Sequence, residues 1–148
     1  MQSFQAKRRV EFADTDMAGI VHFSSFFRYM EETEYAFLRS LGLSVVIQDE
    51  MGTMGMPRRE AKCQYHRPAR FEEVLTIDLQ VAHNDGLRMK HKFRITHQEL
   101  LIAEGELMVV CCRFPKDRAP YAIPFPDQII EHIPLNITRA EEDDTASS

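Results

Sequence analysis

Long apolar runs are missing from this sequence of 148 residues. No stretch approaches the roughly 20 consecutive apolar residues that a membrane-spanning helix requires, so we expect no membrane span. The positive charges of Lys7, Arg8 and Arg9 are not followed by an apolar segment, and we therefore expect no signal peptide either.

Cysteine is also scarce. The chain has three cysteines, and two of them, Cys111 and Cys112, are adjacent within an apolar run. This arrangement does not resemble a disulfide framework, and the CxxC spacing of a structural zinc site is absent. A reducing compartment fits such a protein, and we expect it in the cytoplasm.

Positive charge is not in excess. The chain has 18 Lys and Arg against 23 Asp and Glu, for a net charge of −5. The four acids of Glu141–Asp144, offset by Arg139, contribute −3 of this total, so the remainder carries −2. A nearly neutral body has no basic field for nucleic acid, and a glycine-rich phosphate loop is absent as well.

The length fits one domain with a single core, and we find no internal repeat. We assign this domain to residues 1–133. The remaining segment, residues 134–148, is acidic and ends in serines, which predicts a disordered tail.

Helical periodicity dominates the first third of the chain. Six apolar side chains recur at helical spacing: Phe26, Phe27, Met30, Phe37, Leu38 and Leu41. This pattern predicts a helix from Ser24 to Leu41, with Ser24 or Ser25 as the N-cap and Gly42 as the stop. We expect a further helical turn over residues 44–50 and a loop over residues 51–57.

In the rest of the chain, apolar residues recur at every second position. Alternating apolar residues predict strands over residues 60–66, 75–81, 87–95 and 100–114, the last of them central because it is apolar on both faces. Asn84-Asp85-Gly86 predicts a hairpin. The four prolines from Pro115 to Pro126 end the sheet, and residues 127–133 predict a short helix. The result is an antiparallel sheet with one helix. One helix cannot cover both faces, so we expect self-association.

The segment from Asp14 to Phe23 carries the chemistry. A strand-like stretch runs into Asp14 and Asp16, passes Gly19, and opens into the long helix. The free N–H groups at a helix start favour negative charge. A carboxylate facing an oxygen held there has the layout of an acyl-transfer site.

The motif Val10-x-Phe12-x-Asp14-Thr15-Asp16-x-x-Gly19-Ile20-Val21, followed by the aromatic helix start Phe26–Glu31, resembles the 4-hydroxybenzoyl-CoA thioesterase family. Tyr65-x-x-Pro68-Ala69 also matches, and the similarity extends over residues 7–115. The resemblance implies the hotdog fold, an α+β fold in which an antiparallel sheet of five to six strands wraps round one long central helix. It also implies hydrolysis of acyl-CoA thioesters without a metal or prosthetic group, in dimers or tetramers with sites between subunits.

Carried onto this sequence, the family's catalytic aspartate is Asp16, as nucleophile or general base, and its carbonyl-polarising backbone N–H belongs to Phe23. Gly19 and His22 are substrate-binding candidates, although His22 could simply fill space beside the helix start. Asp14 fits a structural role in the turn. Coenzyme A enters only as part of the substrate.

Basic residues near the mouth of the site would hold the coenzyme A phosphates. Arg88 and Lys90 are our first choices, and Arg58, Arg59 and Arg70 are further candidates.

The family branches leave the acyl group open. Their typical Tyr-His and Pro-Asn pairs are replaced here by His22-Phe23 and Ser24-Ser25. Another group of hotdog thioesterases uses a helix glutamate, but beside Asp16 we interpret Glu31 as a hydrogen-bonding or subunit-contact residue. Two other functions stay open: a hotdog dehydratase with His22 as base, and a non-catalytic acyl-CoA-binding module.

Overall fold

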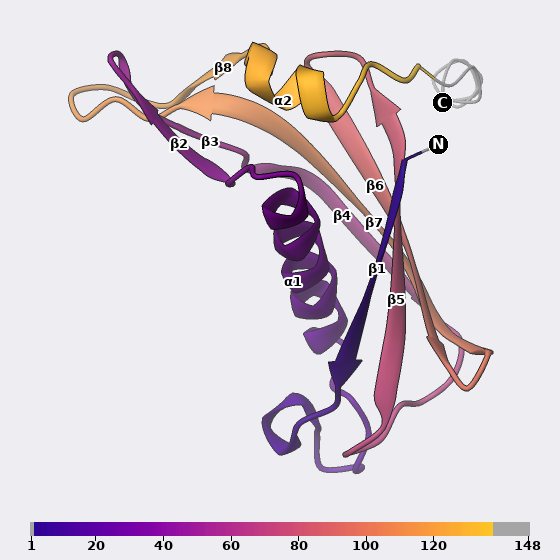
Figure 1. Cartoon of the computed structure of the whole chain (residues 1–148). Helices are drawn as coiled ribbons and strands as arrows, with labels where there is room; N and C mark the ends of the chain where they lie inside the picture. The colour runs from indigo at the N-terminus through magenta and orange to yellow at the C-terminus, as the bar shows by residue number, and fades with distance from the viewer. Residues whose placement is uncertain (1, 138–148) are drawn as a thin grey trace, which may run out of the picture.

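The computed structural model describes residues 2–137, in which a curved antiparallel sheet packs against a helix (Figure 1). The elements in chain order are β1 (Ser3–Arg9), a 3-10 turn (Phe12–Asp14), α1 (Ser25–Ser40), β2 (Val46–Asp49), β3 (Gly52–Gly55), β4 (Arg58–Tyr65), β5 (Val74–Asn84), β6 (Arg88–His97), β7 (Leu100–Arg113), β8 (Tyr121–Ile123) and α2 (Asp127–His132). The main strands follow the order β1-β5-β6-β7, and β4 pairs with the other edge of β7.

The hotdog architecture predicted from the sequence is confirmed. Leu75, Ile77 and Leu79 of β5 point into the core, as do Phe93 and Ile95 of β6, and the residues between them face outward. The two strands pair in antiparallel register around the predicted hairpin, and α2 forms where the short final helix was expected.

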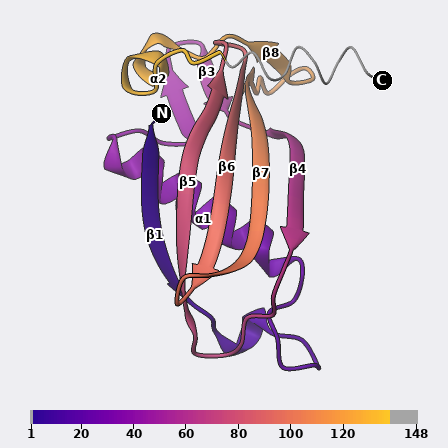
Figure 2. The same ribbon diagram turned by 90° about the vertical axis from the view of Figure 1, so that its right-hand side faces the viewer.

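Helix α1 lies against the concave face of the sheet, behind the strands in the view of Figure 2. Its Met30 and Phe37 are buried in the core. Opposite Met30, β7 carries Gly105, where a Cβ atom would lie 2.3 Å from the Met30 sulfur. Glycine at this position therefore lets the helix approach the sheet closely.

The sheet has eight strands, more than the five to six predicted. Residues 46–49 form β2 instead of a helical turn, β3 lies within the expected loop, and β8 lies among the prolines that were expected to end the sheet. The physical reason is the length of β7, whose 14 residues extend past β4 and β6. Its free edges there pair with β3 and β8, and the Arg113 guanidinium holds Asp49 at 2.7 Å.

The described chain continues beyond α2 as part of the domain. Asn136 and Asn84 exchange two backbone hydrogen bonds, of 2.7 and 2.8 Å, and the Asn136 side chain donates to the carbonyl of Val81. Residues 134–137 are thus tied to β5. The rest of the predicted tail, residues 138–148, lies outside the described residues.

Strand β4 is the least covered part of the sheet. Within residues 2–137, β4 pairs with β7 along one edge and with no strand along the other. Most of its side chains are exposed, including Ala61 and Tyr65, because α1 packs against the middle of the sheet. In the described part of the chain, neither helix is long and apolar enough to cross a membrane.

Candidate active site

The chain between β1 and α1 forms a short hairpin, here called the Asp16 loop (residues 14–24). Thr15 and Val21 form an antiparallel bridge, and the Asp16 N–H donates to the Ile20 carbonyl at 2.9 Å. The Gly19 N–H closes the tip by donating to the Asp16 carbonyl at 3.0 Å. Gly19 has φ +76°, which side chains rarely tolerate, so glycine is needed to turn the loop.

Asp16 lies at this tip as a half-buried carboxylate. One of its oxygens, Oδ1, accepts the backbone N–H of Ala18 at 2.8 Å, which fixes the orientation of the side chain. No residue of the described chain donates to the other oxygen. The carboxylate is therefore both oriented and open to a ligand.

Phe23 lies two residues before α1, as the sequence predicts. Its backbone N–H meets no acceptor among residues 2–137, whereas its carbonyl accepts the Tyr65 hydroxyl from the end of β4 at 2.9 Å. Ser24 occupies the N-cap position, but its side chain makes no capping hydrogen bond. A free donor at a helix start suits an oxygen that gains negative charge.

His22 is held from one side by Ser24. Its Nδ1 lies 2.7 Å from the Ser24 hydroxyl and accepts the Ser24 backbone N–H at 3.2 Å. Because a backbone N–H can only donate, Nδ1 must be the acceptor and Nε2 carries the ring hydrogen. The ring packs on the exposed ring of Phe23, with 4.5 Å between their centroids. His22 thus presents an N–H donor beside the helix start.

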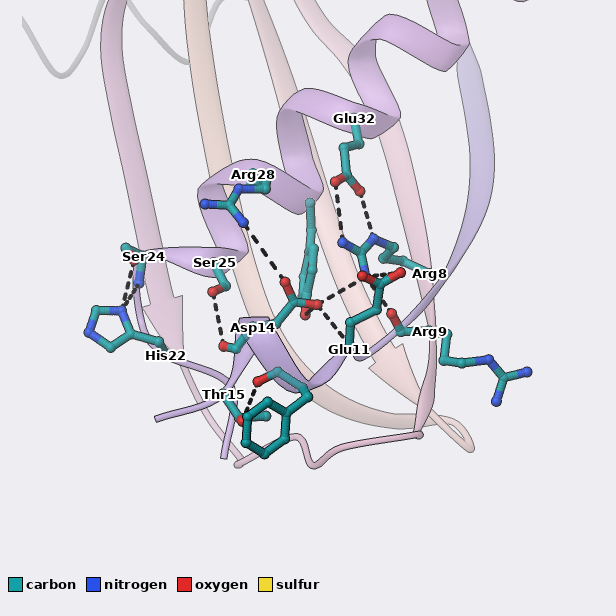
Figure 3. Close-up of polar contacts among 12 residues, drawn as sticks. Arg8, Arg9, Glu11, Asp14, Thr15, His22, Ser24, Ser25, Arg28 and Glu32 are labelled. Carbon is teal, nitrogen blue, oxygen red and sulfur yellow. Dashed lines mark hydrogen bonds and ion pairs between the residues drawn. The ribbon is translucent and has the colours of Figure 1, made fainter. Parts of the chain in front are cut away.

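Asp14 is only two residues from Asp16 but has the opposite surroundings. Figure 3 shows the polar side chains that gather around Asp14. It is 2% exposed, and its Oδ2 accepts the Glu11 backbone N–H at 2.9 Å, the Tyr29 hydroxyl at 2.9 Å and the Arg8 guanidinium at 3.0 Å. Burial alone would raise the pKa of Asp14, but these three donors outweigh it and lower the pKa. The contacts are those of a structural residue, as predicted.

The glutamates of α1 are each paired with an arginine. Glu32 accepts from Arg8 at 2.8 Å, and half-exposed Glu31 lies 3.6 Å from Arg58. Glu34, which is 1% exposed, accepts from the same Arg58 at 2.7 Å, and burial raises its pKa. Buried Glu34 was not singled out in the sequence. Its position on the same stripe as Met30 and Phe37 is the signal that could have marked it.

The structure does not bring Arg88 and Lys90 to Asp16 within one chain. They lie at the start of β6, whereas the Asp16 loop lies at the other end of the sheet (Figure 1). A strand of ten residues, such as β6, spans about 30 Å between these two ends. Arg88 lines a pocket of about 300 Å³ with Arg59. Lys90 is half-buried, and its ammonium lies 3.9 Å from Glu106.

Sequence reasoning missed the side chains that hold the loop in place. Tyr29 was noted only within the aromatic helix start, and Tyr65 only within a strand and the family motif. Their hydroxyls bind Asp14 and the Phe23 carbonyl. Ser25 was noted only as a possible cap, but its hydroxyl donates to the Asp14 carbonyl at 3.0 Å. Among residues 2–137, no three potential metal-ligating side chains of His, Cys, Asp or Glu gather into a cluster.

Comparison with known proteins places this chain in a family. The thioesterase-like superfamily matches residues 10–133. A putative esterase of Aquifex aeolicus is 31% identical over 102 residues, covering 69% of this chain and 79% of that protein. The crystal structure of a 1,4-dihydroxy-2-naphthoyl-CoA thioesterase from Synechocystis superposes with a TM-score of 0.78 at 26% identity, covering 89% of this chain and 96% of the other.

The 4-hydroxybenzoyl-CoA thioesterase of Pseudomonas sp. strain CBS-3 shares the fold, with a TM-score of 0.75 at 19% identity over 88% of this chain and 99% of the other. Together with the family match over residues 10–133, this shared fold confirms the resemblance found in the sequence. With its hotdog architecture and the Asp16 loop at the start of α1, the chain belongs to the thioesterase-like superfamily.

Proposed function

We propose that this protein hydrolyses acyl-CoA thioesters to a free acid and coenzyme A at the Asp16 loop. The observation that carries the proposal is the pairing of an oriented, open carboxylate with an unused backbone donor at a helix start. Asp16 supplies the carboxylate, and Phe23 supplies the backbone N–H. Relatives of this chain that are named as thioesterases and hydrolases support the same reaction.

A thioester needs little help to lose its thiol, because a thiolate is a weak base with a conjugate pKa of about 8.5. Asp16 either attacks the acyl carbon and gives a mixed anhydride that water then opens, or removes a proton from an attacking water. In both routes the carbon–sulfur bond breaks, and the carbonyl oxygen gains charge that the Phe23 N–H stabilises. Loss of one such donor costs about 3–4 kcal/mol in well-studied enzymes.

We further propose that the site is completed by a second copy of the chain joined through β4. A two-fold symmetric pairing of two β4 strands runs antiparallel and lays the Arg58 end of one beside the Tyr65 end of the other. Tyr65 contacts Phe23 of its own chain. The Arg58 end of each subunit therefore approaches the Asp16 loop of the other, and the exposed edge of β4 is covered.

This arrangement gives Arg88 a role that a single chain cannot. Arg58 and Met89 both pair with Val109 of β7, so Arg88 lies at the same end of the sheet as the Arg58 end of β4. In the dimer its pocket, shared with Arg59, lies toward the active site of the other subunit. The two guanidiniums suit the phosphates of coenzyme A. Lys90, already close to Glu106, contributes less.

The cysteine thiols fit a reducing compartment. Cys63, Cys111 and Cys112 are all free in the structure, and burial raises the pKa of the Cys63 and Cys111 thiols. Thiols with a raised pKa are poor nucleophiles and carry no reaction here. We place the reaction in the cytoplasm.

A panel of aromatic, short-chain and long-chain acyl-CoAs, followed by the appearance of free thiol, tests the proposed function. We expect catalytic thiol release with at least one of them. Product formation without thiol release on an acyl chain that carries a hydroxyl would indicate the dehydratase. Saturable binding of acyl-CoA without turnover would indicate the binding module. Either result would contradict the proposal.

The dimer is tested separately by sedimentation at micromolar concentration. We expect a homodimer or a tetramer built from it. A monomer that still hydrolyses acyl-CoA would contradict the shared site but leave the reaction standing.

A further inference from the structure

In the backbone from His22 to Ser25, one N–H group, that of Phe23, has no hydrogen-bond acceptor within residues 2–137. Of the four consecutive N–H groups from His22 to Ser25, three are used: His22 donates to the Asp14 carbonyl at 2.8 Å, Ser24 to the His22 ring, and Ser25 to the His22 carbonyl at 2.9 Å. Only the Phe23 N–H has no acceptor in the described chain. Its neighbours are thus fixed on both sides.

The carbonyl oxygen of Asp14 makes the two contacts that bracket this donor. It accepts the His22 N–H before Phe23 and the Ser25 hydroxyl after it, the latter at 3.0 Å (Figure 3). Ser25 is 5% exposed, so water does not compete well for its hydroxyl. Asp14 in turn precedes Asp16 by two residues. The segment that bears the carboxylate is therefore tied directly to the start of α1.

Helix α1 contacts Asp14 a second time, one turn later. The Tyr29 hydroxyl donates to the Asp14 carboxylate at 2.9 Å, and its side chain is fully buried. Ser25 and Tyr29 are four residues apart and so lie on one face of the helix. One binds the carbonyl of Asp14 and the other binds its carboxylate. Two points of attachment fix both the position and the rotation of the helix start relative to the loop.

We infer that Ser25 and Tyr29 are positioning residues that hold the Phe23 N–H in register with Asp16. This inference rests on the proposed thioesterase function and extends it. A donor to the developing oxyanion acts mainly in the transition state, so its displacement lowers kcat and leaves KM nearly unchanged. Misplacement by about 1 Å can cost about 100-fold, and we expect Ser25→Ala to lower kcat about 10- to 100-fold.

The test compares Ser25→Ala with Ser40→Ala. Ser40 lies at the far end of α1, and its hydroxyl donates to the Phe37 carbonyl of the same helix at 2.6 Å. Both variants lose one hydroxyl-to-carbonyl bond donated by a serine of α1, but only the Ser25 bond connects the helix to the Asp16 loop. We measure kcat and KM with the acyl-CoA that the wild type hydrolyses fastest, at a temperature well below each melting midpoint.

We expect the kcat loss in Ser25→Ala alone, with KM within about twofold of wild type. If Ser25→Ala retains kcat within about twofold, or if Ser40→Ala loses as much, the inference is wrong. Tyr29→Phe keeps the ring and removes only the hydroxyl, so it decides the matter if Ser25→Ala does not fold: a lower kcat at constant KM supports the inference, and unchanged kcat overturns it. An inactive wild type would instead contradict the proposed function itself.

Discussion

Asp14 and Asp16 are the same side chain two residues apart, and the structure treats them in opposite ways. Asp14 is 2% exposed, with three donors on one oxygen and two more on its backbone carbonyl. The Asp16 carboxylate is half-buried, accepts one hydrogen bond from its own turn, and has one oxygen that receives no donor from residues 2–137. The first residue has no capacity left for a substrate, and the second has no contact that stabilises the domain beyond its own turn.

The comparison separates stability from chemistry on physical grounds. A buried carboxylate that receives several donors stabilises the fold, because losing them would leave polar groups without partners. An oriented carboxylate with a free oxygen contributes little stability and keeps its reactivity. Asp14 binds the parts of the loop together so that Asp16 can be left open.

The largest effect that would sharpen the comparison is on stability. Asp14→Asn removes the charge that Arg8 and Tyr29 bind, and we expect the free energy of unfolding to fall by about 3 kcal/mol, with a far smaller loss of kcat than in Asp16→Asn. Urea unfolding of wild type and variant measures this loss of stability. Asp78→Asn is the control, since exposed Gln5 is the partner of that side chain and little stability should be lost. Unchanged stability with a full catalytic loss would break the comparison.

A buried histidine sharpens the contrast further. His91 is 1% exposed, and its Nδ1 has no hydrogen-bond partner among residues 2–137. Burial, aided by Arg58, lowers the pKa of His91 to about 3. The unfolded chain takes up a proton there below a pH of about 6.5, whereas the fold does not, so stability falls as the pH falls. Between pH 7 and 5 this amounts to about 2 kcal/mol.

His91→Phe removes the titrating group and keeps a ring between Phe37 and Phe93. We expect the variant to lose about 2 kcal/mol less stability than wild type over that pH range, as measured by urea unfolding at each pH. Equal slopes in wild type and His91→Phe would contradict the assignment.

The smallest effect concerns the two cations at the start of β6, exposed Arg88 and half-buried Lys90. Replacing both Arg88 and Lys90 with Ala should raise KM for acyl-CoA several-fold and leave kcat largely unchanged, because phosphate contacts are the same in ground and transition states. The effect should shrink at high salt, where exposed charges are screened beyond about 8 Å. Lys90→Ala alone should do less, owing to Glu106.

A short thioester without the nucleotide should not register this change, and Lys7→Ala on β1 controls for the loss of one exposed charge. If the double variant loses the same activity toward both substrates, these residues support the fold and the phosphates bind elsewhere.

Local patterns were enough to predict α1 and the β5–β6 hairpin, and the resemblance to a thioesterase family singled out Asp16 and Phe23 before the helix. The spacing of apolar residues in a helix or strand follows directly from which face is buried. The succession of acids, a glycine and a helix start indicates the Asp16 loop. The pairing of β2, β3 and β8 was not predictable in this way, because it depends on the free edges of the distant strand β7. The contacts of Ser25 and Tyr29 with Asp14 are likewise tertiary. No local pattern distinguishes a hydroxyl that caps a helix from one that holds a neighbouring loop.

The most direct test of the account is the rate of thiol release by Asp16→Asn under saturating acyl-CoA, measured beside the wild type. We predict that kcat falls at least about 100-fold, while the melting midpoint and the oligomeric state stay as they are, because Asp16 bonds only within its own loop. A folded Asp16→Asn variant that keeps kcat within about tenfold, a barrier change of only about 1.4 kcal/mol, would show that Asp16 is not the group that performs the reaction.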